Sequence, residues 1–299
     1  MSSIEVALQV FQRLTREDLR VLRAVEDGMR RSEFVPEDYI VNRAKLPMGR
    51  VKFALSRLNK FNLIYQMQSA YVGHTLNYAG YDCLAIVAFV KANVVEAFGK
   101  PVGVGKEADV YEALTPTHRR IAVKFHRLGR TSFRQTRRKR GYTETHAGWL
   151  YQSRLAAWKE FTALKEVYKC RLPVPEPIMQ NRHAIAMGMI EGVPLAQLRE
   201  IPNPEATLRR ILRSMKKAYV KAKRVHGDLS AYNILLKPNG QILIIDWPQS
   251  VSMEHPNAEQ LLRRDVRNIL EYFEHKHHVQ FDSTLAYDYV TDKTRQFTG

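Results

Sequence analysis

The chain of 299 residues contains 47 Lys and Arg against 30 Asp and Glu, a formal net charge of +17 that favours a polyanionic partner. Its 45% hydrophobic and 26% charged residues exclude a disordered or collagen-like chain, and its two cysteines, Cys83 and Cys170, exclude a disulfide framework. The longest apolar run, residues 83–90, is far shorter than the roughly 20 residues that span a bilayer, so we expect a cytoplasmic protein with no membrane partner and no disulfide partner.

The first 80 residues predict short helices followed by a hairpin. Thr15 begins one helix, with Asp18 placed three residues on to complete a box-like cap. Pro36 opens a second helix, and a third follows Pro47. Two strands are then expected at 63–68 and 70–77.

The third of these helices is basic on its outward side. Its apolar residues leave Arg50, Lys52 and Arg57 largely outward. Helices and hairpin in this order resemble a winged-helix domain, over residues 1–78, in which the third helix enters a groove of nucleic acid. We therefore expect these three side chains to contact nucleic acid. A small helical domain that binds another protein is the alternative.

The rest of the chain predicts an α+β domain. A long apolar helix over residues 79–98 is expected to connect it to the N-terminal part, and a glycine-bounded hairpin follows at 99–126. The remaining expected elements are a helix at 155–170, strands at 183–190 and 242–246, and helices near 258–276 and 283–293.

Positive charge is concentrated inside this domain. Residues 119–140 carry ten Lys and Arg and no carboxylate, and residues 209–224 carry eight and none. Most charge runs are solvated surface. A stretch this long without compensating acid repels itself, so a polyanion partner is the better explanation.

A glycine-rich turn early in the domain suits phosphate binding. Its glycines let backbone N–H groups approach phosphate oxygens, although such a turn alone is weak evidence. The expected contacts are Gly103, Val104, Gly105, Lys106, Glu107, Ala108, Asp109 and Val110. Lys124, on the returning strand, is placed to neutralise phosphates, and Glu160 is the natural carboxylate to orient it.

A stronger motif lies near the C-terminus of the domain. HGDLSAYN places Asp228 and Asn233 five residues apart, and Asp246 follows an apolar strand in IIDW. Phosphoryl transfer needs a carboxylate to orient the acceptor, for which Asp228 is the candidate. Asn233 and Asp246 supply the hard oxygen ligands that Mg²⁺ prefers. Asp228, Asp246 and Lys124 are therefore the predicted catalytic residues.

Five segments together resemble the RIO family of atypical serine/threonine kinases. They are GKEADVY, VKFHRLGRTSFRQTRRKRGY, KEF, HGDLSAYNIL and IIDWPQ. The N-terminal winged helix narrows the resemblance, which covers residues 1–285, to the second RIO subfamily, and the lack of a long C-terminal tail suggests an archaeal member. Trp247 stands where that family more often has Phe, and Ala108 where it often has Ser.

This resemblance implies a winged-helix domain followed by a bilobed kinase-like fold, with an N-lobe over 99–187 and a reduced C-lobe over 188–299. It implies ATP with Mg²⁺ or Mn²⁺, kinase or ATPase activity, and a role in maturation of the small ribosomal subunit and its ribosomal RNA. Asp228 would be the catalytic base and Asp246 a site of phosphorylation. Met187, Gly188 and Ile190 match the hinge that reads adenine through the backbone.

The chain leaves little room for the peptide-docking helices of an ordinary protein kinase, because only about two helices can follow Asp246. A basic loop over 129–148 is expected to be mobile and to contact RNA instead. Its expected RNA contacts are Arg134, Arg137, Arg138, Lys139 and Arg140.

Two alternatives remain. A small-molecule phosphotransferase of the aminoglycoside or choline kinase type shares HGDxxxxN and IDW, but it would want an acidic pocket for cationic substrates. A winged-helix regulator with nucleotide-controlled binding to nucleic acid is the other, and an intact set of site residues argues against it.

Overall fold

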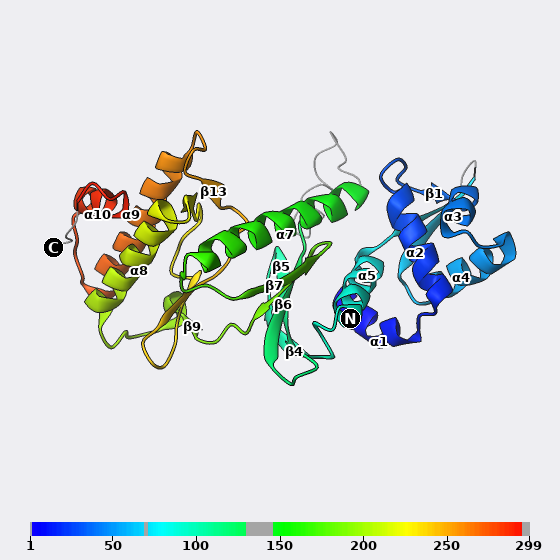
Figure 1. The fold of residues 1–299 in the computed structure, drawn as a ribbon, viewed down its shortest axis with the longest axis horizontal. Helices are drawn as coiled ribbons and strands as arrows, with labels where there is room; N and C mark the ends of the chain where they lie inside the picture. Colours follow the sequence, from blue (N-terminus) through cyan, green and yellow to red (C-terminus); the bar gives the residue numbers. More distant parts are fainter. Residues whose placement is uncertain (1, 69–70, 130–145, 295–299) are drawn as a thin grey trace. The chain divides into compact units, whose positions relative to one another are not determined.

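The computed structural model describes residues 2–68, 71–129 and 146–294 (Figure 1). The chain divides into two compact units, which are considered separately below. The first comprises Met1–Ala157 with Met179–Ala186, and the second comprises Trp158–Ile178 with Met187–Gly299. Within this division, the finer boundaries expected at 78, 98 and 187 stay a prediction.

The N-terminal part of the first unit is mainly helical. Its elements are α1 (Ser3–Val10), a 3₁₀ turn (Phe11–Arg13), α2 (Arg16–Gly28), β1 (Val35–Pro36), α3 (Glu37–Ala44), α4 (Met48–Lys60), β2 (Ile64–Gln68), β3 (Val72–Leu76) and α5 (Tyr78–Lys91). The predicted cap of α2 is confirmed: Thr15 accepts a hydrogen bond from the Asp18 N–H at 3.3 Å, and Asp18 accepts from the Thr15 N–H at 2.7 Å. The two orphan donors at the start of the helix are thereby satisfied.

Three strands and three helices form the winged-helix part of this unit. The sheet has the antiparallel order β1-β3-β2, and α2 packs against α3, α4 and β3. α5 packs against α1 and is buried along most of its length. It ends at Lys91 rather than near 98, because Asn93 has left-handed backbone (φ 54°) and the chain turns into the next strand.

A five-stranded sheet makes up the rest of the first unit. Its strands run in the order β4-β5-β6-β8-β7. They are β4 (Ala97–Val104), β5 (Ala108–Leu114), β6 (Arg120–His126), β7 (Pro177–Asn181) and β8 (Ala184–Gly188). The segment predicted as a hairpin, residues 99–126, therefore forms three strands. The helix predicted at 155–170 is α7 (His146–Lys169), which begins nine residues earlier.

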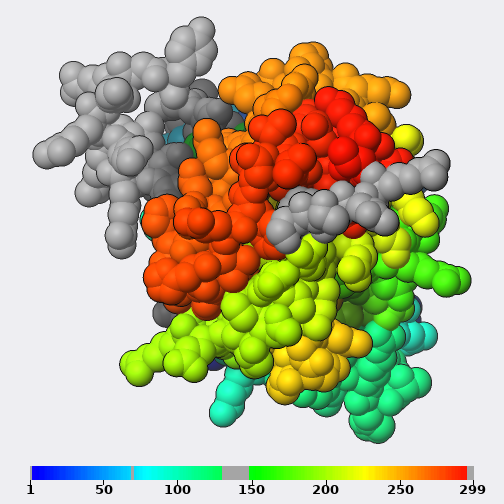
Figure 2. Space-filling model, turned by 90° about the vertical axis from the view of Figure 1, so that its left-hand side faces the viewer, coloured from blue at the N-terminus to red at the C-terminus, as the bar shows by residue number. Residues whose placement is uncertain are grey.

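The second unit is built from the C-terminal part of α7, which enters it at Trp158, from short strands and from three further helices. Its strands are β9 (Val193–Pro194), β10 (Arg224–Val225), β11 (Ile234–Leu236), β12 (Ile242–Ile244) and β13 (Val251–Ser252), with a 3₁₀ turn at Leu195–Gln197. The helices are α8 (Pro204–Val220), α9 (Ala258–His277) and α10 (Ser283–Val290), and they pack on one another (Figure 2). The last two match the two helices predicted after Asp246.

Both cysteines are free, with Cys83 buried. No helix within the described ranges is long and apolar enough to cross a membrane.

Candidate active site

The loop between β10 and β11 holds Asp228 and Asn233 together. The Asn233 side-chain amide donates to the backbone carbonyl of Asp228 at 2.9 Å, and its backbone N–H donates to Ser230 at 3.0 Å. The side chain of Asn233 thus closes the turn that runs from Asp228 to Asn233. This explains the fixed spacing of the HGDxxxxN motif, because moving Asn233 by one position would break both bonds.

Asp246 follows β12 on the neighbouring loop. The Ile245 N–H donates to the Asn233 carbonyl at 2.9 Å, so the two motifs are joined through the backbone. Asp246 itself has left-handed backbone, φ 68°. Such backbone is strained for a residue with a Cβ, and strain of this kind gathers at functional sites.

Glu160 of α7 also reaches this loop. It is 1% exposed, and its carboxylate accepts a hydrogen bond from the Trp247 N–H at 3.3 Å. Trp247 is itself buried, with its ring centroid 4.6 Å from that of His226. The tryptophan at this position is therefore accommodated by packing on the histidine of the HGD motif.

His226 links the two loops as a neutral side chain. Its Nε2–H donates to the Ile245 carbonyl at 3.0 Å, and its Nδ1 accepts from the Asp228 N–H at 3.3 Å. Burial lowers the pKa of His226, against the opposing pull of the Ile245 carbonyl and of the carboxylates of Asp246, Asp228 and Glu160. Three carboxylates thus act electrostatically on one histidine.

Asp265 on α9 positions the HGD loop and was not found by sequence reasoning. Its two carboxylate oxygens accept from the backbone N–H groups of Gly227 at 2.8 Å and Leu229 at 2.9 Å. The neighbouring Arg264 donates to the Gly227 carbonyl. Burial raises the pKa of Asp265 to about 6 despite these donors. The only signal in the sequence is a carboxylate at a buried position of an amphipathic helix.

Gly227 is required by the same loop. Its φ is +81°, and a Cβ there would lie 2.6 Å from the Gln249 carbonyl. No residue with a side chain fits this position without moving the backbone. The glycine of the HGD motif is therefore structural, and it lets Asp228 stand beside Asn233.

The phosphate-binding candidates lie in the first unit. Lys124, in β6, is 8% exposed and pairs across the sheet with Val110 of β5. The predicted glycine-rich turn joins β4 to β5, where the Gly105 N–H donates to the Ala108 carbonyl at 2.8 Å. A Cβ at Gly103 would meet nothing within 4 Å, so the backbone there is open. Lys106 and Glu107 are exposed at the tip of this turn.

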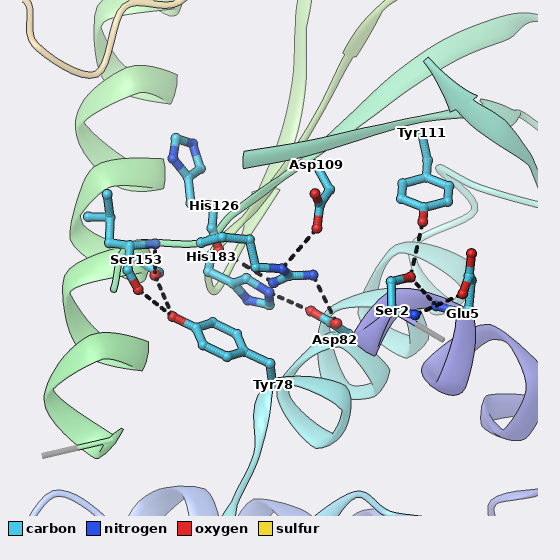
Figure 3. A network of polar contacts seen from close by, with 11 residues as sticks. Ser2, Glu5, Tyr78, Asp82, Asp109, Tyr111, His126, Ser153 and His183 are labelled. Atoms are coloured by element: carbon cyan, nitrogen blue, oxygen red, sulfur yellow. Dashed lines mark hydrogen bonds and ion pairs between the residues drawn. The ribbon is translucent and has the colours of Figure 1, made fainter. Parts of the chain in front are cut away.

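Asp109 is placed differently from its predicted neighbours. It is 1% exposed, and Arg127 donates to its carboxylate at 3.3 Å (Figure 3). Arg127 also donates to Asp82 of α5 at 2.9 Å, and Asp82 accepts from His183 at 2.7 Å. The side chain of Asp109 thus belongs to a buried cluster of charges inside the first unit.

The predicted hinge begins at the end of β8. Met187 is 2% exposed, and the Gly188 N–H donates to the Glu176 carbonyl at 2.8 Å. Ile190 is half-buried just beyond the strand. The second unit thus brings Glu160, Asp228, Asn233 and Asp246 together, whereas Lys124 and the glycine turn belong to the first.

The predicted nucleic-acid contacts of α4 are engaged in ion pairs within the winged-helix part. The pairs are Arg50 with Glu17 at 2.9 Å, Lys52 with Glu37 at 3.7 Å and Arg57 with the buried Asp18. A guanidinium bound to a buried carboxylate holds α4 against α2, and its charge is already compensated. The loop contacts Arg134, Arg137, Arg138, Lys139 and Arg140 lie outside the described residues.

The donor set suits Mg²⁺ bound jointly with a phosphate ligand. Asn233 and Asp246 provide an amide and a carboxylate oxygen on adjoining loops. Within the part of the chain that the structure describes, no group of three or more His, Cys, Asp or Glu could hold a metal. Two protein oxygens with phosphate and water as further ligands is the usual way that Mg²⁺ is bound beside a nucleotide.

The chain is similar to known proteins along most of its length. A family model of the RIO domain matches residues 109–285, and one of the Rio2 N-terminal domain matches residues 11–92. The chain is 44% identical to the RIO-type serine/threonine-protein kinase Rio2 of Methanocaldococcus jannaschii, over 88% of this chain and 100% of that protein. It is 38% identical to the serine/threonine-protein kinase rio2 of Schizosaccharomyces pombe, over 93% and 82%.

A solved structure covers nearly the whole chain. The Rio2 kinase of Chaetomium thermophilum, described as an ADP/Mg²⁺-phosphoaspartate complex, is similar with a TM-score of 0.81 and 36% identity. The similarity covers 94% of this chain and 88% of that one. The family models match both predicted domains and the identity to its members is high, so the chain belongs to the Rio2 family of RIO-type serine/threonine-protein kinases.

Proposed function

We propose that this kinase binds ATP with Mg²⁺ and transfers the γ-phosphoryl group from the site around Asp228. The observation that carries the proposal is the joining of the two loops. Asn233 bonds to Asp228 on one side and to Ile245 on the other, so the expected base and the expected metal ligands are held in one hydrogen-bonded unit. The nucleotide complex of the Chaetomium relative supports the same assignment.

Each residue then has a task that its chemistry allows. Asp228 accepts the proton of the attacking hydroxyl, and Asn233 and Asp246 bind the metal through oxygen. Lys124 neutralises phosphate charge, and Glu160 orients that lysine. Bound Mg²⁺ withdraws charge from the phosphate oxygens. The glycine turn contributes backbone N–H groups over Gly103–Val110, and the backbone at Gly188 and Ile190 reads adenine.

The same site would allow a second reaction, the hydrolysis of ATP through Asp246. An Asp246 carboxylate oxygen can form a bond to the γ-phosphorus while the bond to the bridging oxygen breaks and ADP leaves with that electron pair. Water then hydrolyses the acyl phosphate, and the net reaction is ATP hydrolysis. The phosphoaspartate named for the Chaetomium relative supports this route.

We further propose that the substrate particle is a precursor of the small ribosomal subunit, bound through its RNA. The net charge of +17 and the winged-helix part support a polyanionic partner. Affinity that comes from phosphate contacts falls steeply with added salt.

Replacing Asp246 tests the chemical part of the proposal. Asp246→Asn should lower phosphoryl transfer from γ-labelled ATP by a factor of about 10³ or more, because one metal ligand loses its charge. In wild type, ATP with Mg²⁺ should raise the melting temperature more than ATP with EDTA, and this difference should vanish in the variant.

The exposed Glu254→Gln is the matched control and should behave as wild type in both measurements. Label that neutral hydroxylamine releases, and that is absent from Asp246→Asn, would identify the acyl phosphate. Full turnover by Asp246→Asn would show that the metal assignment is wrong.

A further inference from the structure

Two adjoining cavities open on the first unit where α2 lies near the start of α7 and the turn between β7 and β8. One, of about 320 Å³, is lined by five arginines, two carboxylates and Asn181. The other, of about 370 Å³, is mainly apolar and shares Glu26, Arg30 and Arg154 with the first. Because they share these residues, the two cavities adjoin, and together they offer a charged part and an apolar part.

The two carboxylates of the charged part are already neutralised. Glu26 accepts two hydrogen bonds from the Arg182 guanidinium, at 2.8 and 2.6 Å. Asp27 accepts from Arg43 at 2.6 Å and from the Tyr39 hydroxyl at 3.0 Å, and these bonds lower the pKa of Asp27. Each acid thus has one arginine of its own.

Three arginines are left over. Arg23, Arg30 and Arg154 are exposed, and no carboxylate oxygen of the described residues lies within 4.0 Å of their guanidinium nitrogens. In α4, by contrast, the basic residues are paired with acids. The charged part thus holds five guanidinium groups against two carboxylates, and an anion with several oxygens would stabilise this excess of positive charge.

The apolar part suits a flat ring. Its walls are the side chains of Met29, Leu76, Leu150, Tyr81 and Tyr151. Tyr81 is 4% exposed and is held by stacking on His183, with centroids 4.6 Å apart. Tyr151 is 58% exposed, so one aromatic face is available. A cavity of this size lies in the range of ligand sites, roughly 300–1,000 Å³.

We propose that the two cavities bind one unpaired nucleotide of single-stranded RNA. The base lies in the apolar part against Tyr151, and the flanking phosphates lie on Arg23, Arg30 and Arg154. Aromatic stacking of unpaired bases beside an arginine-rich path for the backbone is how single strands are bound. An acidic peptide would satisfy the arginines and leave the apolar part empty. The inference rests on the proposed RNA partner and names the site at which that RNA binds.

Anisotropy of a short fluorescent single-stranded RNA, titrated at several KCl concentrations, separates the two parts. The triple variant R23A/R30A/R154A should bind more weakly, with a log Kd against log salt slope reduced by about 2, since each single-strand phosphate contact adds roughly 0.7. Tyr151→Ala should raise Kd about tenfold and leave the slope unchanged, because it removes stacking and no charge.

Two matched controls accompany these variants. K60A/K91A/K100A removes three exposed charges of the same unit away from the cavities and should keep the wild-type slope. Tyr151→Phe keeps the ring and should keep the wild-type Kd. The same RNA annealed into a duplex should lose the effect of Tyr151→Ala, since its bases are paired, and free AMP should compete poorly because it lacks the second phosphate.

The outcomes distinguish this site from the function as a whole. Equal slopes for R23A/R30A/R154A and the control triple, or equal Kd for Tyr151→Ala and Tyr151→Phe, would overturn the site while RNA binding by wild type remains. A peptide rich in aspartate that binds wild type but not R23A/R30A/R154A, and ignores Tyr151→Ala, would show a protein-docking surface instead. If the wild-type protein binds no RNA at low salt, both the proposed partner and this site are wrong. The proposal of phosphoryl transfer would not be affected.

Discussion

At the scale of single residues, His183 shows how burial sets a protonation state. It is fully buried in the first unit, where Asp82, Arg127 and His126 act on it electrostatically and the Tyr81 ring stacks on it. Burial is the largest cause of a pKa of about 4, and it outweighs the favourable contact with Asp82. The imidazole is therefore neutral at pH 7 and donates one hydrogen bond.

This pKa predicts an acid-sensitive first unit. In the unfolded chain His183 takes up a proton near pH 6.5, whereas the folded state resists it until about pH 4, so stability is lost as pH falls through this window. The free energy of unfolding should fall by roughly 1 kcal/mol per pH unit from this residue alone. Urea unfolding of wild type and His183→Gln at pH 7.5, 6 and 5 measures it as a difference, in which other titrating groups cancel.

His183→Gln keeps a donor for Asp82 but does not titrate, so its stability should depend less on pH. The exposed His275→Gln is the control and should follow wild type. If His183→Gln and wild type lose stability in parallel, His183 is not the group responsible.

At the scale of elements, α9 controls the HGD loop from outside it. Asp265 receives two backbone N–H groups of that loop, and α9 itself is held by packing on α8 and α10. A carboxylate that acts in this way is a positioning residue. Its geometry fixes Asp228 without contacting the substrate.

Asp265→Ala should therefore lower kcat roughly 10–100-fold while the KM for ATP changes little, as for other residues that orient catalytic groups. Asp265→Asn should be intermediate, because an amide can accept only one of the two donors. Wild-type kcat should also fall as pH drops through about 6, where Asp265 takes up a proton, and this limb should be missing in Asp265→Asn. Steady-state kinetics against pH measure all three.

Glu274→Ala, an exposed change on the same helix, should leave kcat and its pH profile as in wild type. A rise in KM for ATP with kcat intact would instead place Asp265 in nucleotide binding.

The elements also show what local sequence can predict. The sequence predicted the start of α2 from its capping residues Thr15 and Asp18, and it predicted the two helices after Asp246. The HGDxxxxN and IIDW motifs are each contiguous in the sequence, so the two loops that they form could be predicted from local sequence alone. Asp265 was not predictable, because its partners are 36 and 38 residues away and only the packing of α9 brings them together. The ion pairs of α4 were missed for the same reason.

At the scale of the whole molecule, a buried cluster of charges ties α5 to the sheet of the first unit. Arg127 is 2% exposed and binds Asp82 of α5 and Asp109 of β5 (Figure 3). Its guanidinium also lies 5.1 Å from the ring centroid of Tyr78. The winged-helix part and the five-stranded sheet thus share one charged interior, which explains why they form one compact unit.

Removing one member of this cluster should destabilise the unit strongly. Arg127→Ala should lower the free energy of unfolding by about 3–5 kcal/mol, since two buried carboxylates lose the guanidinium that they share. Replacing all three charges, as D82L/D109L/R127M, should recover much of that loss because no uncompensated charge remains. Urea unfolding with hydrogen exchange of α5 and β5 measures both.

The control is Arg120→Ala, which removes an exposed pair with Glu112 on the same sheet and should change stability by less than about 1 kcal/mol. Equal effects of Arg127→Ala and Arg120→Ala would mean that the buried cluster contributes little to holding the unit together.

Because Asp246 has left-handed backbone, the residue that is best for stability at this position differs from the residue that the proposed reaction needs. Glycine would adopt φ 68° without the penalty of roughly 1 kcal/mol that a Cβ brings, and it would remove one of three crowded carboxylates. A library selected only for heat resistance should therefore enrich glycine at 246 and accumulate proteins that fold better and transfer nothing. Under the proposed function, aspartate would be kept at 246 only by selection for the reaction, against the small gain in stability that glycine offers.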